Sequence, residues 1–172
     1  MKIRKDKKVS VIAGVVMIVC FAAVQYFPSV ASATEYKSLR DVKSAKAVFD
    51  LRTGQPMVAL NTLELIGKTY KTLIEAKKKP KFVVVFFGPS LRLISRNTSG
   101  FKPEEVKVLH KIAQTVSAMS REGIKLEICL VSAKNFHVNP ESVLPEINKV
   151  PNGWIALIEY QARGYSLVPA YY

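Results

Sequence analysis

Phe82-Val83-Val84-Val85-Phe86-Phe87-Gly88-Pro89 is the stretch of this sequence that decides the fold. Its six consecutive apolar residues, three of them β-branched, are typical of a strand that is buried on both faces. The glycine and proline that follow are residues that end such a strand. Because a strand buried on both faces requires helices on each side of its sheet, the sequence predicts an α/β fold.

Upstream of this strand, the pattern predicts a strand followed by a helix. Residues 45–51 have the composition of a strand, and the turn residues Thr53-Gly54-Gln55-Pro56 come after it. From residue 57 to residue 76, apolar residues recur at helical spacing. This strand–helix–strand order favours parallel pairing through a right-handed crossover.

Downstream, helices and strands continue to alternate, with glycines and prolines between them. A polar connection is expected around residues 139–145, where Asn139-Pro140 and Leu144-Pro145 interrupt the pattern. The other expected elements, in chain order, are a short helix at 90–95, a helix from 103 to 122, a strand at 124–131, a helix at 154–162 and a strand at 165–168.

The N-terminus has the pattern of a secretory signal. Its first ten residues contain five basic residues, and an apolar run follows at residues 11–24. Ala31-Ser32-Ala33 is the kind of small-residue site that a signal peptidase accepts. We therefore expect a signal peptide at 1–33, a lead-in at 34–44 and one α/β domain at 45–172. The predicted location is the periplasm, with no stable membrane insertion after cleavage, and tethering by an uncleaved signal anchor is the alternative.

The chain is strongly basic, with a formal net charge of +13. Loss of the signal would remove five of the 26 basic residues and one of the 13 acidic residues, which leaves an excess of nine positive charges. A basic balance often indicates nucleic-acid binding, but export argues against that partner. Anionic lipid headgroups, acidic proteins and small oxyanions remain as counterparts, and solubility alone is an equally open explanation.

Cysteine usage raises a sharper question. Cys20 lies in the apolar run of the predicted signal, so the mature chain would keep Cys129 alone. Exported chains usually pair their cysteines. A lone cysteine is therefore buried and inert, paired between chains, or a working thiol.

The carboxyl ends of the predicted strands indicate where a ligand would bind. In open parallel sheets, ligands collect beyond these ends. Three strands end at Arg52-Thr53-Gly54, at Gly88-Pro89-Ser90 and at Cys129, and the last helix begins after Pro151-Asn152-Gly153. Glycines allow close backbone approach, and N–H groups at helix N-termini stabilise a thiolate.

Several of these segments together resemble the DsrE/DsrF-like family. Residues 46–56 and 86–92 resemble its opening strands, and residues 123–129 are similar to its third strand with its cysteine. The resemblance continues at Leu144-Pro145, at residues 150–153 and at residues 160–165. It implies a three-layer α/β/α sandwich with a mainly parallel sheet of about five strands, which usually assembles into trimers or hexamers.

The resemblance also implies a role for Cys129. In sulfur-relay members of the family, the matching cysteine carries a persulfide and exchanges sulfur with a thiol-bearing donor or acceptor protein. Seven further residues are candidates for binding a substrate or an anion near this thiol: Arg92, Gly88, Ser90, Lys134, His137, Asn152 and Gly153. We expect no cofactor, and no metal site because the two histidines are scattered.

Two hypotheses of different classes follow. The first is a periplasmic sulfur-binding or sulfur-transfer protein that carries a persulfide on Cys129. The second is a non-catalytic oligomeric module that binds a small anion or an acidic protein, with Cys129 as a packing residue. Native reactivity of the thiol would separate them.

Overall fold

The computed structural model describes residues 39–170. Within them, five strands form one parallel sheet in the order β4-β3-β2-β1-β5. The strands are β1 (Lys46–Leu51), β2 (Lys81–Phe86), β3 (Lys125–Cys129), β4 (Asn148–Val150) and β5 (Ser166–Ala170). The predicted signal peptide, and the lead-in up to residue 38, lie outside the described residues.

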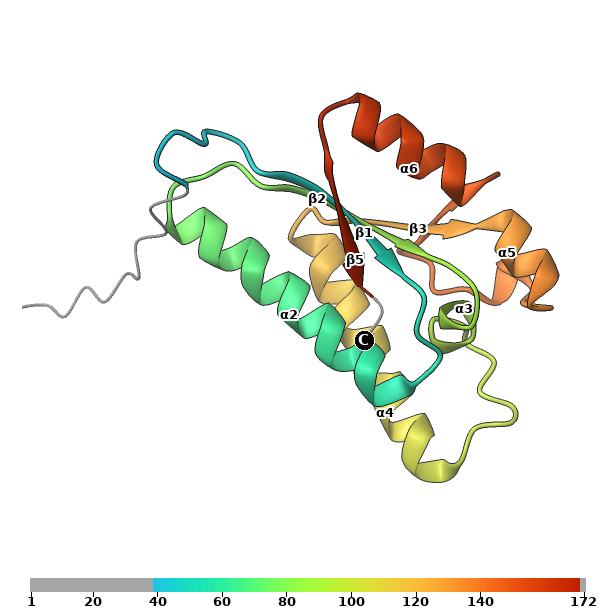
Figure 1. The fold of residues 1–172 in the computed structure, drawn as a ribbon. Helices are drawn as coiled ribbons and strands as arrows, with labels where there is room; N and C mark the ends of the chain where they lie inside the picture. The colour runs from blue at the N-terminus through green and yellow to red at the C-terminus, as the bar shows by residue number, and fades with distance from the viewer. Residues whose placement is uncertain (1–38, 171–172) are drawn as a thin grey trace, which may run out of the picture. The chain divides into compact units, whose positions relative to one another are not determined.

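Helices cover both faces of the sheet. Figure 1 shows the two longest helices, α2 and α4, together on one face, and α6 on the other. The helices are α2 (Pro56–Glu75), α3 (Ser90–Leu93), α4 (Pro103–Arg121), α5 (Leu130–Asn135) and α6 (Gly153–Ala162), with a 3-10 turn at Pro140–Ser142. The predicted three-layer α/β/α sandwich with a mainly parallel sheet of about five strands is confirmed.

Strand β2 explains why the sheet needs helices on both faces. Phe82, Val84 and Phe86 belong to the core under α2 and α4, whereas Val83 and Val85 belong to the core under α6. All five side chains are buried. Since burying a side chain of this kind contributes about 1.5–3 kcal/mol, this strand is a main source of the stability of both layers.

The long helices begin and end close to where the sequence predicts. Helix α2 begins at Pro56 and α4 at Pro103, because proline suits the first turn of a helix. At the start of α4, the Lys102 N–H donates to Glu105 Oε2 at 2.8 Å. Beyond its end, Gly123 has a φ of +89°, a conformation that favours glycine.

Two predictions about the third strand and the region after it are wrong. Leu130 and Val131 belong to α5, because the chain turns into this helix directly after Cys129 without a turn residue. Residues 148–150 form the short edge strand β4, within a segment expected to be a polar connection and the start of the last helix. Its exposed Asn148 and Lys149 gave no hydrophobic signal of a strand.

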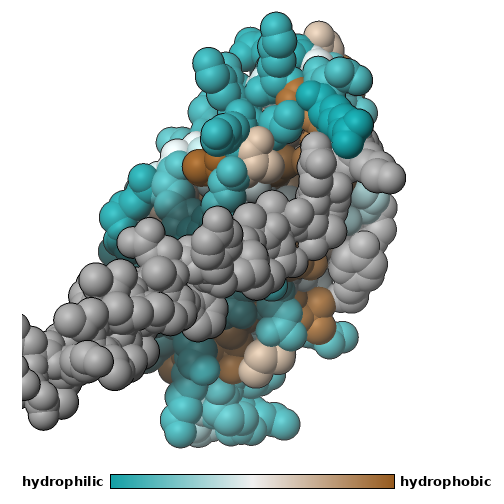
Figure 2. Space-filling model, turned by 90° about the vertical axis from the view of Figure 1, so that its left-hand side faces the viewer, coloured by the Kyte–Doolittle hydropathy of each residue, from teal (hydrophilic) through white to brown (hydrophobic). Residues whose placement is uncertain are grey.

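The described surface is largely polar. On the face that Figure 2 shows, hydrophilic side chains predominate and the hydrophobic ones form small separate groups. No helix among residues 39–170 is both long enough and apolar enough to span a membrane.

Candidate functional site

Cys129 lies at the carboxyl end of β3 and caps the N-terminus of α5. Its Sγ accepts hydrogen bonds from the backbone N–H of Gly153, at 3.2 Å, and of Ser132, at 3.3 Å. The residue is only 4% exposed. The sulfur therefore meets the first turns of two helices, and such N–H groups favour negative charge on a bound atom.

Gly153 makes this arrangement possible. A Cβ at this position would lie 2.4 Å from Cε1 of Phe87 and 2.9 Å from Cβ of Cys129. Both contacts are too short for carbon atoms, so the close approach of α6 to Cys129 requires glycine.

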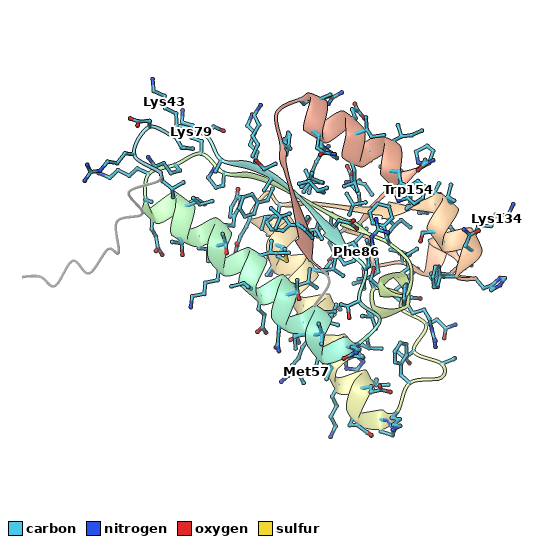
Figure 3. All side chains as sticks on the ribbon, in the orientation of Figure 1. Lys43, Met57, Lys79, Phe86, Lys134 and Trp154 are labelled. Atoms are coloured by element: carbon cyan, nitrogen blue, oxygen red, sulfur yellow. The ribbon has the colours of Figure 1, made fainter. Side chains whose placement is uncertain are left out.

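A cavity of about 390 Å³ adjoins the cysteine. Its walls are mainly apolar, and they include Phe87, Phe136 and Trp154 together with Cys129. Trp154 is 64% exposed, and Figure 3 shows it at the start of α6. A small ligand in this cavity would be in contact with Cys129 and with aromatic side chains.

Arg52 lines the same cavity and is held in place from two sides. Its Nε lies 2.8 Å and 2.9 Å from the two carboxylate oxygens of Asp50, and its Nη2 lies 2.8 Å from Asp50 Oδ2. Its guanidinium carbon lies 4.9 Å from the centre of the Phe87 ring. The buried Asp50 carboxylate thus fixes the Arg52 guanidinium at the wall of the Cys129 cavity as one half of an ion pair.

The loop after β2 forms another part of the wall. Gly88 has a φ of +57°, and its N–H donates to Ser132 Oγ at 2.6 Å. Ser90 lies nearby but is fully buried, and its hydroxyl bonds to the carbonyl groups of Leu51 and Phe87. Gly88 therefore faces the predicted site, whereas the Ser90 hydroxyl connects two strand ends.

Asn152 caps α6 and lines the Cys129 cavity. Its Oδ1 accepts the N–H of Trp154 at 3.0 Å. This bond fixes the first turn of α6, and with it the N–H of Gly153 that contacts the sulfur.

The other predicted residues are not part of this cavity. Arg92 and His137 line a second cavity of about 340 Å³, which shares Phe136 with the first. Lys134 points outward from α5 (Figure 3). The structure therefore brings Gly88, Asn152 and Gly153 to Cys129, and places Arg92 and His137 together elsewhere.

A buried polar contact joins α6 to β3 two residues before Cys129. The hydroxyl of Tyr160 donates to Oε1 of Glu127 at 2.6 Å, and Lys125 Nζ lies 3.7 Å from the same oxygen. Burial, and next the bond to Glu127, raise the pKa of Tyr160 far above its ordinary value. Oε2 of Glu127 has no hydrogen-bond partner among residues 39–170.

The sequence of the described α/β domain matches one protein family. The sequence model described as the DsrE/DsrF-like family matches residues 46–169. The chain belongs to the DsrE/DsrF-like family.

One relative of this DsrE/DsrF-like protein comes from a bacterium. An uncharacterised protein of Aquifex aeolicus (strain VF5) is 27% identical over 125 residues, which are 72% of this chain and 55% of that protein. The chain thus spans about half the length of this relative.

Two solved structures show the same fold. One is MTH1491 from Methanobacterium thermoautotrophicum, a protein of unknown function, with a TM-score of 0.57 and 13% identity. The other is the ychN protein from E. coli, with a TM-score of 0.54 and 9% identity. Each similarity covers 73% of this chain and 98% of the other.

The sequence interpretation missed the aromatic and cationic walls of the site in this DsrE/DsrF-like protein. Arg52 stands at a strand end that the sequence identified, but its role depends on Asp50, two residues earlier on the same face of β1. That spacing is a signal that the sequence does contain. Phe136 could not be assigned, because α5 was not predicted. Trp154 begins a helix that was predicted, but the pattern does not show that its side chain lines the cavity. Among the described residues, no group of three or more His, Cys, Asp or Glu is placed to hold a metal ion.

Proposed function

We propose that this DsrE/DsrF-like protein accepts sulfane sulfur on Cys129 and passes it to the thiol of a partner protein in the periplasm. One observation carries the proposal: Cys129 Sγ adjoins a cavity while two backbone N–H groups, from Gly153 and Ser132, donate to it. Membership of a family associated with sulfur relay supports the same chemistry.

The transfer needs no external oxidant. The Cys129 thiolate attacks the terminal sulfur of a donor persulfide, R–S–S–H. A bond forms between Sγ and that sulfur, the S–S bond of the donor breaks, and its electron pair leaves with the donor as R–S⁻, while the proton stays on the transferred sulfur. The reverse type of step, with an acceptor thiolate as the attacking group, regenerates the Cys129 thiolate.

The walls of the cavity suit a sulfur intermediate. Phe87, Phe136 and Trp154 provide apolar contacts to a polarisable sulfur atom and limit the access of water. Arg52, held by Asp50, lines the same cavity with a guanidinium group, a donor type that suits an anionic persulfide.

Export and assembly belong to the same proposal. The basic, apolar and small-residue segments of residues 1–33 support secretion, with an N-terminal anchor as the alternative. A trimer or hexamer is supported by exposed apolar residues on α6, Trp154, Ile155 and Ile158. Sedimentation of the purified protein tests the oligomer, and a single monomeric species would contradict that part.

The decisive test is the intact mass of the protein purified from the periplasm without reductant. We expect a chain that starts at Thr34 and carries about 32 Da of additional mass, one sulfur atom, which dithiothreitol removes. After treatment with glutathione persulfide, the increment should reach one sulfur per chain.

Two matched serine substitutions serve as variant and control. Cys129→Ser should fold normally and carry no labile sulfur. Cys20→Ser should load like the wild type, because removal of residues 1–33 leaves the two mature chains identical. Equal sulfur loads in wild type and Cys129→Ser would contradict the proposal, and a chain that retains residues 1–33 would favour the tethered alternative.

A second candidate is the non-catalytic binding module, and the low exposure of Cys129, 4%, is the observation that favours it. In that case a maleimide would label Cys129 only after denaturation. Fast and stoichiometric labelling of the native protein supports sulfur transfer instead.

A further inference from the structure

The second cavity, of about 340 Å³, has a polar wall that differs from the wall of the Cys129 cavity. It lies between the segment after α3 and the segment that follows α5. The polar side chains that line it include Arg92, Ser95, Asn97, His137, Asn139 and Ser142. Guanidinium, imidazole, amide and hydroxyl groups can all donate hydrogen bonds to an anion.

Two chain segments that are far apart in sequence hold this wall together. The N–H of Arg96 donates to the carbonyl oxygen of Ser142 at 2.7 Å, and the N–H of Leu144 donates to that of Ile94 at 3.0 Å. The hydroxyl oxygens of Ser95 and Ser142 lie 2.8 Å apart. The Ser142 hydroxyl donates to the carbonyl oxygen of Asn139 at 2.7 Å, so the two serines use their protons to hold the wall together.

Arg92 contributes the strongest donor group. Its guanidinium carbon lies 5.0 Å from the centre of the Phe101 ring, so the ring supports one face of the guanidinium. Nη2 also makes a long contact of 3.5 Å to the carbonyl oxygen of Ser99. Among residues 39–170, the planar group is held by stacking and by a neutral acceptor, and not by a carboxylate that would cancel its charge.

The charge around the cavity is positive. No aspartate or glutamate is among the residues that line it. The nearby Glu141 carboxylate bonds to Lys149 Nζ, which lowers the pKa of Glu141 and neutralises its charge. Arg96 adds a second guanidinium close by, whose Nη2 donates to the carbonyl oxygen of Glu141.

His137 completes the wall from the other side. It follows α5 with a φ of +53°, a conformation that residues other than glycine rarely adopt. Phe136, the residue before it, belongs to the walls of both cavities. The second cavity is thus next to the Cys129 cavity but has its own donors.

From this geometry we infer that the second cavity binds a small tetrahedral oxyanion, such as sulfate, thiosulfate or phosphate. Arg92 binds two oxygens through its planar edge, and the His137 imidazole and the side-chain NH2 groups of Asn97 and Asn139 donate to the others. The inference does not depend on sulfur transfer, because the hydrogen bonds to Cys129 Sγ come from Ser132 and Gly153 and from none of these donors.

The test is calorimetric titration of the Cys129→Ser protein with sulfate, thiosulfate and phosphate, at constant ionic strength set with chloride. We expect saturable binding at one site per chain. Arg92→Gln should weaken it by about 10-fold or more, the loss typical of a charged hydrogen-bond donor, and His137→Gly by about 3-fold or more, the loss of one ordinary donor. Lys134→Gln is the matched control, because it removes a positive charge from α5 outside the cavity, and it should change the dissociation constant by less than about two-fold.

Each outcome has a definite meaning. Equal binding by Arg92→Gln and the Cys129→Ser parent would overturn the inference, as would an equal loss in Lys134→Gln, which indicates general charge attraction. No saturable binding of any of the three anions overturns it too. Binding in the Cys129→Ser background supports it whether or not the wild type carries a persulfide.

Discussion

The two neighbouring cavities of this protein are built in opposite ways. The Cys129 cavity lies at the carboxyl ends of β2 and β3, where Gly153 permits a backbone contact with the sulfur. The Arg92 cavity lies between loops, and its walls depend on hydrogen bonds between segments 94–96 and 142–144. The comparison teaches that the sheet fixes where the thiol lies, whereas irregular segments determine which polar groups accompany it.

The largest effect should come from Gly153→Ala. The added Cβ would collide with Phe87 and Cys129, so α6 must move away from the sulfur. Overpacking of this kind costs about 1–3 kcal/mol, which urea denaturation measures. Gly67→Ala in α2 is the control: its Cβ would lie 4.0 Å from Met119 Cγ, and alanine should stabilise the helix by about 0.5–1 kcal/mol. If Gly153→Ala leaves the free energy of unfolding unchanged, α6 is not packed tightly against Cys129.

The next largest loss of stability is expected for Tyr160→Phe, since this change removes the hydrogen bond to the buried Glu127. The carboxylate then loses its phenol donor, at a cost of about 1–3 kcal/mol.

The same residue predicts a dependence on alkaline pH. Because the folded-state pKa of Tyr160 is raised, the unfolded chain releases this proton first as pH rises above about 10. The free energy of unfolding contributed by Tyr160 is then present below that pH and is lost above it, by up to about 1.4 kcal/mol per pH unit. The free energies of unfolding of wild type and Tyr160→Phe should converge as pH rises above about 10. If the two free energies instead fall in parallel with pH, Tyr160 is not the group responsible for the loss.

Asp50→Asn should lower the free energy of unfolding by less. Asp50 is buried, but its partner Arg52 is partly exposed, so solvent weakens their ion pair. We expect a loss of about 1–2 kcal/mol and slower sulfur loading of Cys129, since Arg52 is no longer held at the wall of the cavity. Glu159→Gln, which breaks the exposed pair with Arg163, should change stability by less than about 0.5 kcal/mol. Unchanged loading kinetics in Asp50→Asn would remove Arg52 from the mechanism.

Apart from the control substitutions, the smallest effect on stability, and one of opposite sign, is expected for His137→Gly. Glycine adopts the φ of +53° without strain, so the free energy of unfolding should rise by about 0.5–1 kcal/mol. The same variant should lose anion binding, which separates the function of this residue from the stability of the loop. Thermal denaturation checks the sign, and a destabilised variant would mean that the imidazole packs as a structural group.

The sequence was most informative where hydrophobic pattern and turn residues agree. The buried run of β2, the stripe of α4 and the positions of Gly123 and Gly153 were readable, and so was the arrival of Cys129 at the edge of the sheet. Helix α5 was not readable, because it begins directly after a strand and its cap is a cysteine side chain instead of a serine or aspartate.

The placement of Arg92 and His137 could not be predicted for a related reason. Each follows a strand end closely in sequence, but the direction of the short helices α3 and α5 decides where they point. That direction depends on contacts such as the one between Gly88 N–H and Ser132 Oγ, which join positions 44 residues apart. Local pattern contains no information on contacts of that range.

Cys129 Sγ accepts hydrogen bonds from the backbone N–H groups of both Gly153 and Ser132. The two amide protons sit next to the atom that reacts, so they are built-in spectroscopic probes of its chemical state. In a ¹⁵N-labelled sample, oxidation or alkylation of the thiol should displace these two resonances first, and their hydrogen-exchange rates should report how firmly α5 and α6 are seated on the sulfur at each stage.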